Sequence, residues 1–208
     1  MTVVAAFDFD ATLTDRDTVV PFLRRLAGDT GLAVGLAREA RNVVPAVARR
    51  DRDRLRVIAT RQVFAGRRIA DVDAAAAPYG AHIHDTWLRA DTTGRLAWHL
   101  EQGHRVVIVS ASYEQYVRVV AARLGAEAVL ATRLEVDAGT CTGRLAGDNC
   151  RGPEKVIRLR SWLAAEGLER DEVTLWAYGD SSGDRELLAE ADHPHWVRDR
   201  LDSVRPVP

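Results

Sequence analysis

Short apolar runs that end abruptly in polar residues recur along the chain. The clearest are Val3–Phe9, Val106–Val109 and Val173–Tyr178. Continuous apolar runs of this length, without a polar alternate face, are typical of parallel strands that are buried on both sides. Ala128–Ala131 is a weaker candidate, and His195–Val197 is a candidate for a short last strand. These positions predict a parallel sheet.

Helical patterns separate these runs. They cover Thr92–Gln102, Tyr113–Leu124 and Glu154–Glu166, and each is followed directly by a glycine, a residue that commonly ends helices. Strands that alternate with helices predict an α/β fold, a parallel sheet with helices on both faces. Right-handed crossovers then bring the carboxyl ends of the strands to one edge.

Residues 16–90 do not follow this alternation and read as almost continuous helix. The apolar positions that carry this pattern are Val34, Leu36, Ala40, Val43, Val44 and Val47. We expect interruptions at Pro45 and near Pro78-Tyr79-Gly80. The sequence thus predicts an α/β catalytic core of residues 1–15 and 91–208, with a helical cap domain, residues 16–90, inserted after the first strand.

Length and charge fit that division. The 208 residues suffice for one domain and a modest insertion. The net charge of −1 gives no reason to expect a nucleic-acid partner. The cap range holds 14 Arg against 8 acidic residues, and the remainder holds 15 basic against 22 acidic residues. A basic segment beside an acidic one suits an anionic ligand held near a metal, although solvated faces often look the same.

The sequence also bears on the cellular setting. Two cysteines, Cys141 and Cys150, make no disulfide framework and, without a histidine cluster, no zinc site. No apolar run reaches membrane-spanning length, and the chain opens with strand-like residues rather than a signal peptide. We therefore expect a reduced, cytoplasmic protein.

Two pairs of acids follow predicted strands. Asp8 and Asp10 stand two apart at the end of the first strand, and like charges that close need a cation or a shared proton. Asp180 and Asp184 follow a later strand in the segment Gly179–Asp184. Either pair alone could serve a loop or a helix cap. Together, at one sheet edge, they indicate a magnesium site, because Mg²⁺ accepts one or two carboxylates plus phosphate oxygens.

Ser110 and Lys155 complete the set. Ser110 ends the strand Val106–Val109, where a serine is often only a helix cap. Lys155 is the one lysine in a chain with 28 arginines, which suggests a place where a compact ammonium is required and a planar guanidinium does not serve.

The order of these motifs, DxDxT at Asp8–Thr12, then Ser110, Lys155 and GDSxxD at Gly179–Asp184, resembles the haloacid dehalogenase superfamily. Within it the chain is similar to the phosphoserine-phosphatase-like subclass (subfamily IB), which has a Rossmann-like core and a helical cap after the first motif. The resemblance runs nearly end to end. It departs at Ala11, where the family usually has glycine.

The resemblance implies a role for each motif residue. Asp8 would attack phosphorus, and Asp10 would protonate the leaving oxygen and later activate water. Thr12 would position the first motif and the phosphoryl group, and Ser110 and Lys155 would hold phosphate oxygens.

The implied cofactor is Mg²⁺, bound by Asp8, the carbonyl of Asp10, and Asp180. Asp184 would not bind the ion directly but would orient the residues that do. The physical account agrees, because phosphoryl transfer needs an in-line nucleophile, positioning and neutralised charge rather than elaborate covalent chemistry. The predicted enzyme is a phosphoric monoester hydrolase that works through a phospho-aspartate.

The sequence leaves the substrate open between small-molecule and lipid phosphates, and membrane contact is expected only for a lipid substrate. Phosphoserine phosphatase proper is the alternative, but Asp17 stands where such enzymes carry a glutamate that faces the substrate amine. Residues 49–56 are dense in arginine, and a solvated helix face accounts for most of these side chains. Arg54 and Arg56 are the candidates to reach the substrate.

Two other activities fit the motifs less well. A haloacid dehalogenase also uses an aspartate nucleophile but needs no magnesium site, so Asp10, Asp180 and Asp184 argue against it. A receiver-type switch also combines acids, a hydroxyl and a lysine, but its phosphorylated aspartate follows a mid-chain strand and no long cap is inserted. Repeated turnover of p-nitrophenyl phosphate separates an enzyme from such a switch.

Overall fold

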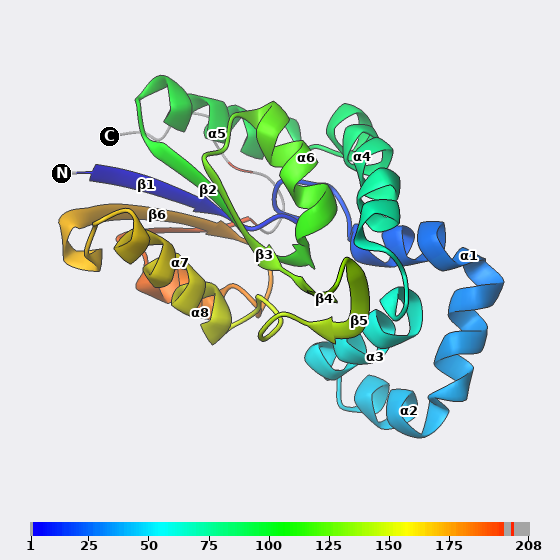
Figure 1. The fold of residues 1–208 in the computed structure, drawn as a ribbon. Coiled ribbons are helices and arrows are strands. Elements are labelled where there is room, and N and C mark those ends of the chain that lie inside the picture. Colours follow the sequence, from blue (N-terminus) through cyan, green and yellow to red (C-terminus); the bar gives the residue numbers. More distant parts are fainter. Residues whose placement is uncertain (1, 198–200, 202–208) are drawn as a thin grey trace.

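The computed structural model describes residues 2–197 and 201 and has a five-stranded parallel sheet at its centre (Figure 1). The strand order is β3-β2-β1-β6-β7. The strands are β1 (Thr2–Phe7), β2 (Arg105–Tyr113), β3 (Ala128–Thr132), β6 (Val173–Gly179) and β7 (His193–Trp196). Each overlaps a strand predicted from the sequence, and the α/β fold class is confirmed.

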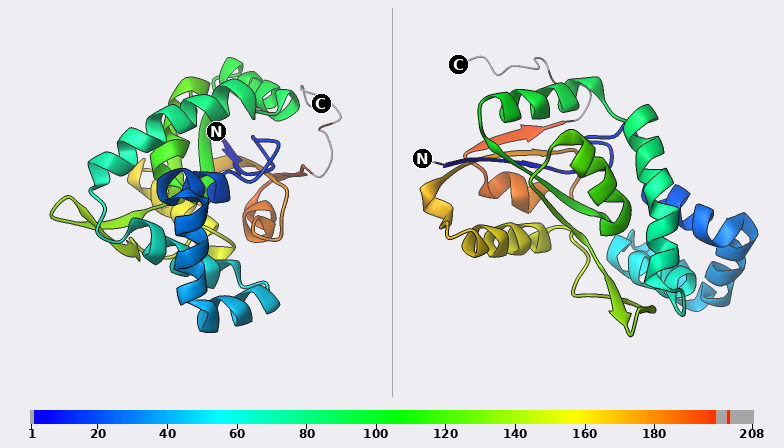
Figure 2. Two further views of the ribbon diagram at one scale, coloured as in Figure 1. Left: turned by 90° about the vertical axis from the view of Figure 1, so that its right-hand side faces the viewer. Right: turned by 45° about the horizontal axis from the view of Figure 1, so that its top comes forward.

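Helices cover both faces of this sheet (Figure 2). On one face lie α5 (Ala90–Glu101) and α6 (Glu114–Leu124), and on the other α7 (Pro153–Ala165) and α8 (Arg185–Glu190). A short 3₁₀ turn, Arg170–Glu172, leads into β6. Two clusters of buried hydrophobic side chains, one on each face, pack the helices against the sheet. Alternate residues of β1 point to opposite clusters, which explains why the strand is apolar throughout.

Residues 16–90 are helical, as predicted, but the helix breaks lie elsewhere. The segment forms α1 (Val19–Arg38), α2 (Ala40–Ala48), α3 (Arg52–Phe64) and α4 (Ile69–Thr86). The predicted interruptions are wrong, because Pro45 lies inside α2 and Pro78 inside α4. A helix-internal proline costs about 3 kcal/mol, and in α4 the buried face packed on α6 offsets this cost.

Local backbone chemistry sets the actual breaks. Gly28 adopts φ 70°, ψ 160° and kinks α1, a conformation open to glycine. Arg50 has φ 54° after the end of α2, and Asp51 then accepts a hydrogen bond from the Arg54 N–H at 2.9 Å to cap α3. The helices of this segment therefore begin, bend or end at capping residues and at residues with left-handed backbone conformation, and not at prolines.

An antiparallel hairpin that the sequence analysis does not predict joins the main sheet to α7. Its strands are β4 (Leu134–Asp137) and β5 (Thr140–Leu145). Ala138 (φ 45°) and Gly139 (φ 79°) form the turn between them, and two positive φ angles suit the twist of a two-residue hairpin. β5 packs against α3, so the hairpin supports the helical segment at that helix (Figure 1).

Five rings pack the helical segment onto the rest of the fold, and we call them the aromatic seam: Phe22, Phe64, Tyr79, Tyr113 and Tyr116. Phe22 lies 4.9 Å from Tyr116 and 5.2 Å from Tyr79 between ring centroids, and Phe64 lies 4.8 Å from Tyr113. All five are buried. The division into a core and a cap domain stays a prediction, but this packing joins α1, α3 and α4 firmly to β2 and α6.

Both cysteines are free and buried, which agrees with the absence of a disulfide framework. Among the helices of the described residues, none is both long enough and apolar enough to cross a membrane.

The contact between α4 and α6 gives a prediction for stability. An ideal Cβ on Gly80 lies 2.6 Å from Val119 Cβ and 2.9 Å from the Tyr116 carbonyl oxygen, so Gly80→Ala should lower the free energy of unfolding by about 1–3 kcal/mol. Gly31 in α1 meets nothing closer than Ala27 Cβ at 3.7 Å, so Gly31→Ala should raise it by up to about 1 kcal/mol. Urea unfolding of both variants checks the contrast, and equal effects of the two would contradict the close helix contact.

Candidate active site

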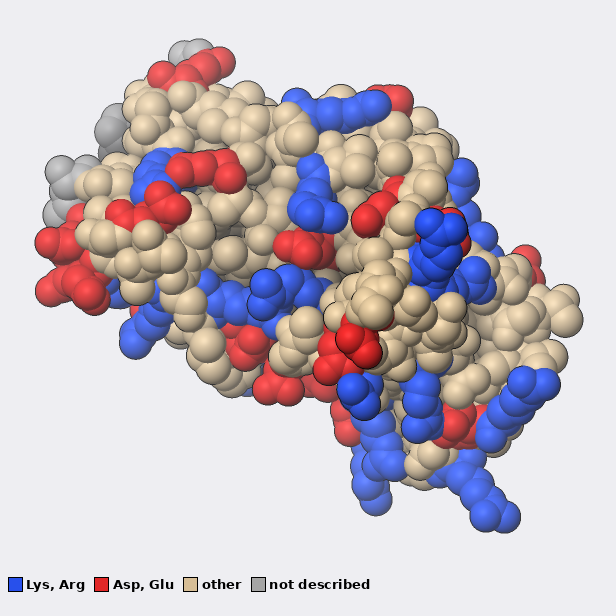
Figure 3. Space-filling model, in the orientation of Figure 1, with Lys and Arg blue, Asp and Glu red and all other residues tan. Residues whose placement is uncertain are grey.

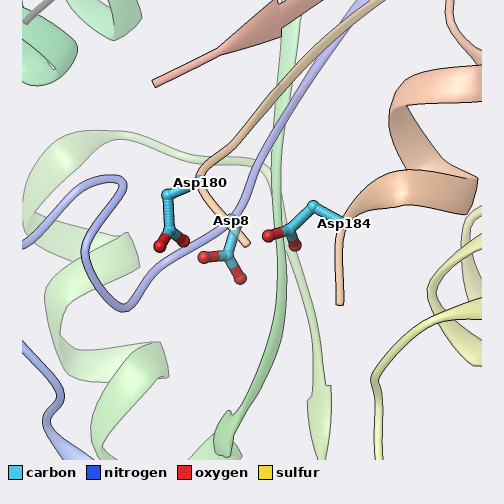
Figure 4. A group of neighbouring side chains, drawn as sticks. All are labelled: Asp8, Asp180 and Asp184. Carbon is cyan, nitrogen blue, oxygen red and sulfur yellow. The ribbon is translucent and has the colours of Figure 1, made fainter. Parts of the chain in front are cut away.

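Three carboxylates converge at the carboxyl edge of the sheet (Figure 4). Asp8 directly follows β1, Asp180 follows β6, and Asp184 precedes α8. One oxygen of each lies within 4.8 Å of the others. The adjacency of β1 and β6 brings them together, and the Asp8 N–H donates to the Tyr178 carbonyl at 2.9 Å to continue the ladder. The structure thus brings together three acids that are 176 residues apart at most in sequence.

Lys155 lies between two of these acids. Its Nζ donates to Asp8 Oδ1 at 2.5 Å and to Asp184 Oδ1 at 2.6 Å, and the residue is only 1% exposed. Burial opposes the charge of an ammonium, but the two carboxylates outweigh it and hold the pKa of Lys155 above its usual range. The first turn of α7, begun by Pro153, sets this position.

One ammonium does not balance the acids around it. Burial, followed by the charge of Asp184, raises the pKa of Asp8, and the same two causes raise the pKa of Asp180. Asp184 differs, because Lys155 lowers its pKa despite burial. Three carboxylates face one ammonium here, so among the described side chains Lys155 alone does not balance these acids when all three are ionised.

The turn after β6 depends on a glycine. An ideal Cβ on Gly179 would lie 2.4 Å from Asp184 Cβ, so any side chain there would push Asp184 away. Ser181 fixes that carboxylate from the other side, donating from its N–H and its hydroxyl to Asp184 Oδ2 at 2.9 Å each. The Gly179–Asp184 motif is thus a closed turn that aims Asp180 and Asp184 at Asp8.

Asp10 accepts hydrogen bonds from two residues of its own, Thr18 and Ser112. Thr18 donates to Asp10 Oδ1 from its N–H at 2.9 Å and its hydroxyl at 2.5 Å, and Ser112 Oγ donates to Oδ2 at 2.5 Å. Burial, with the charge of Asp17 adding to it, raises the pKa of Asp10 to about 6 against the effect of these hydrogen bonds. At this pKa the carboxyl group can both give and take a proton near neutral pH.

Sequence reasoning missed Thr18 and Ser112 as partners of Asp10. A signal for Ser112 was present, because residues two apart on a strand share a face and Ser110 was already a candidate. Ser110 is 1% exposed and lines the same cavity as Asp10, and its Oγ accepts the Ser112 N–H at 3.0 Å. No such signal points to Thr18, which the fold of the loop after β1 brings to Asp10.

Thr12 lies beside Asp180. It is buried, its hydroxyl donates to Asp180 Oδ1 at 3.3 Å, and it does not line the cavity at Asp8. This geometry allows Thr12 to orient Asp180, and its expected role in positioning the first motif and the phosphoryl group stays a prediction.

A cavity of about 610 Å³ opens over the acids. Its floor includes Asp8, Asp10, Lys155, Asp180 and Asp184, and its opposite wall comes from α1, α2 and α3. Asp17 also lines this cavity. Its Oδ1 accepts the Val19 and Val20 N–H groups at 3.0 and 3.1 Å, so one oxygen of Asp17 caps the start of α1.

The structure separates the two candidate arginines. Arg54 is exposed, donates to Asn42 Oδ1 at 3.1 Å and does not line the cavity, so a contact between Arg54 and the substrate stays a prediction without support from this geometry. It lies two residues from Arg56 on α3, and such neighbours face different directions on a helix. Arg56 does line the cavity, lies 4.9 Å from the Tyr113 ring centroid, and has a buried Nη1 without a hydrogen-bond partner among the described residues.

The comparison with protein families decides the identity of this arrangement. The model of haloacid dehalogenase-like hydrolases matches residues 5–189, a range that includes Asp8, Asp10, Ser110, Lys155, Asp180 and Asp184. The chain belongs to the haloacid dehalogenase-like hydrolase family.

One of the similar curated proteins matches most of the chain, and another matches less than half of it. Protein CicA of Caulobacter vibrioides is 37% identical over 190 residues, which are 91% of this chain and 83% of CicA. Phosphoserine phosphatase SerB1 of Mycobacterium tuberculosis is 35% identical over 91 residues, 44% of this chain and 29% of that protein. The chain is thus a hydrolase of this family, and a protein named as a phosphatase is among those to which it is similar.

A solved structure supports the fold of the hydrolase. The crystal structure of a Bordetella pertussis protein of unknown function matches with a TM-score of 0.75 and 26% identity, covering 91% of this chain and 87% of that one. The match spans both the parallel sheet and the helical segment.

Ala11 gives a prediction about the hydrolase's first loop. It has φ 59°, a left-handed conformation that costs a residue with a Cβ about 1–2 kcal/mol, and the family's usual glycine would avoid this cost. Ala11→Gly should leave the free energy of unfolding unchanged or raise it by up to about 1 kcal/mol, because the greater entropy of the unfolded chain offsets part of the gain. Ala138→Gly, at φ 45° in the β4–β5 turn, is the matched control and should behave alike. A loss of stability in Ala11→Gly alone would contradict this account.

Proposed function

We propose that this enzyme is a Mg²⁺-dependent phosphomonoesterase that works through a phospho-aspartate on Asp8. The observation that carries the proposal is the meeting of Asp8, Asp10, Ser110 and Lys155 at the floor of one cavity, beside Asp180 and Asp184. A nucleophile, a proton carrier, phosphate-binding groups and a cation site are the parts that phosphoryl transfer needs.

The donor set fits a magnesium ion. Asp8, Asp180 and Asp184 offer carboxylate oxygens within 4.8 Å of one another, and hard cations prefer oxygen ligands. The excess negative charge of these acids is what a divalent cation neutralises. Asp8 and Asp180 would hold the ion together with the carbonyl of Asp10, and Asp184, already paired with Lys155, would orient the others. When bound, Mg²⁺ would screen Asp8 from the anionic substrate and polarise the phosphoryl group.

The side chains then divide the reaction into two steps. In the first, an oxygen of Asp8 bonds to phosphorus while the bond from phosphorus to the ester oxygen breaks, and Asp10 gives its proton to the leaving alcohol. In the second, a water molecule, deprotonated by Asp10, attacks phosphorus, and the aspartyl oxygen leaves. The products are the alcohol and inorganic phosphate, and Asp8 and Asp10 return to their starting states.

Lys155 and Ser110 would hold the nonbridging phosphate oxygens during both steps. Lys155 is already hydrogen-bonded to Asp8, so it need not move to stabilise the negative charge of a phosphoryl group being transferred to that carboxylate. Arg56, with its unpartnered Nη1 in the cavity wall, would meet an anionic group of the substrate.

Phosphoserine phosphatase proper remains the second candidate, because SerB1 bears that name. The residue that would meet a substrate amine is Asp17, which is shorter by one methylene than glutamate. One of its oxygens already accepts two N–H groups of α1. We therefore expect L-phosphoserine not to be the best substrate.

The nucleophile gives the central prediction. Asp8→Asn should lower kcat for p-nitrophenyl phosphate at least about a thousandfold, because an amide does not attack phosphorus. EDTA should abolish turnover of the unaltered enzyme, and added Mg²⁺ should restore it. Steady-state assays measure both effects.

Asp15→Asn serves as the control, since Asp15 is an exposed carboxylate of the same loop that pairs with Arg16. It should retain activity, and circular dichroism should show all variants folded. Full activity of Asp8→Asn, or multiple turnovers in excess EDTA, would sink the mechanism. A single labelling event without turnover would instead indicate a switch.

A second prediction concerns Lys155. Lys155→Arg should lower kcat/KM about tenfold or more, because a guanidinium is bulkier and does not fit a 1%-exposed position between two carboxylates without displacing Asp8. The control is Arg160→Lys on the exposed side of the same helix, which should leave kcat/KM unchanged. If Lys155→Arg retains nearly all activity, the point-charge role of Lys155 is wrong.

A further inference from the structure

The wall of the cavity that faces the acids is aliphatic. Of the eleven lining residues that come from α1, α2 and α3, nine are Val, Leu or Ala, and the other two are Arg52 and Arg56. The aliphatic side chains include those of Leu23, Leu32, Leu36, Val43, Val47 and Leu55. The cavity therefore has a charged floor and an apolar wall in one continuous space.

This wall is not simply the inside of a packed core. Leu23 and Leu32 are buried, but Val47 is 57% exposed and Val20 is 45% exposed, so the apolar surface continues from the cavity to the outside. Exposed apolar surface of this kind next to polar groups marks a place where a ligand binds. A chain longer than the cavity could leave across these two valines.

The wall also argues against a polar leaving group. A hydroxyl, amine or carboxylate placed against Leu36, Val43 and Val47 would lose water without gaining a hydrogen bond, which makes binding of such a group unfavourable. An aliphatic chain in the same place gains from leaving water. The arginines at the wall are still able to meet the phosphate end of such a molecule.

We infer that the substrate is a phosphomonoester whose leaving alcohol carries an aliphatic chain, with the phosphate on Asp8 and the chain along the α1–α3 wall. The inference rests on the proposed phosphatase activity and specifies its substrate class. The phosphate and the chain occupy the two ends of one cavity, so a single molecule accounts for both surfaces.

The first test measures kcat/KM for ethyl, butyl, hexyl and octyl phosphates, each below its critical micelle concentration and in the presence of Mg²⁺. p-Nitrophenyl phosphate and L-phosphoserine are assayed as comparison substrates. We expect kcat/KM to rise about two- to fourfold per methylene until the chain fills the cavity, and to exceed the value for phosphoserine. A flat or falling series in an enzyme that turns over p-nitrophenyl phosphate overturns the inference and leaves the phosphatase activity standing. Failure to turn over any phosphate ester counts against the proposed function itself.

The second test uses the two sides of α2. Val43 and Val47 line the cavity, whereas Val44, on the same helix, is 64% exposed and does not line it. Val43→Thr/Val47→Thr keeps the shape and adds hydroxyls, and it should lower the ratio of octyl to ethyl phosphate kcat/KM about tenfold. Val44→Thr should keep the ratio of the unaltered enzyme. An equal ratio in both variants contradicts an α2 contact with the chain.

A binding measurement makes the inference independent of turnover. Octylphosphonate and ethylphosphonate cannot be hydrolysed, because carbon replaces the ester oxygen. Calorimetry in Mg²⁺ should show octylphosphonate binding at least about sixtyfold more tightly, with a more negative heat-capacity change, the mark of apolar burial. Equal affinities of the two phosphonates would overturn the inference even if the enzyme proves to be an active phosphatase.

Discussion

The arrangement at the sheet edge depends on the ion pairs that Lys155 makes with Asp8 and Asp184. Two strands and a helix start bring several carboxylates into a space that excludes most water, and like charges in such a place repel strongly. Lys155 offsets part of that repulsion from within, and its position on α7 links the second half of the chain to the first strand. The pairing of β1 with β6 and the closed turn at Gly179 place Asp8 and Asp184, and Lys155 stabilises the two carboxylates in those positions.

Charge is also segregated on a larger scale. Residues 19–64, which form α1 to α3, hold ten Arg and four acidic residues, whereas the chain as a whole has a net charge of −1. Figure 3 shows blue side chains projecting from the end of the molecule that α2 and α3 occupy. An anion that approaches this end meets a positive potential before it reaches the carboxylates, and such a field raises the rate of encounter.

The strand ends and their acids could be predicted from the sequence because both signals are local. An apolar run that stops at Asp8 or before Asp180 identifies a buried strand and its carboxyl end without any knowledge of the fold. Lys155 also stood out in the sequence, as the one lysine among 28 arginines. Parallel topology then brings these residues to one edge, as the structure shows.

The features that could not be predicted from the sequence depend on packing between distant segments. Proline usually breaks a helix, but Pro45 and Pro78 lie inside helices. For Pro78 the reason is the tertiary packing of α4 on α6, which the sequence does not reveal. The contact of Thr18 with Asp10, and the choice of Arg56 rather than Arg54, depend on how the helices after β1 turn relative to the sheet. The β4–β5 hairpin depends on two left-handed residues, of which only Gly139 has a sequence signal.

The aromatic seam has a consequence for the evolution and engineering of such enzymes. Phe22, Phe64 and Tyr79 come from the helical segment, while Tyr113 and Tyr116 come from β2 and the start of α6. The rings of the helical segment pack between those of β2 and α6. A helical segment from another protein would therefore not fit this surface unless its rings matched. A chimera that exchanges residues 16–90 between family members must transfer matching rings at 113 and 116 as well, and the helical segment and these two positions of the sheet side should therefore vary together across lineages.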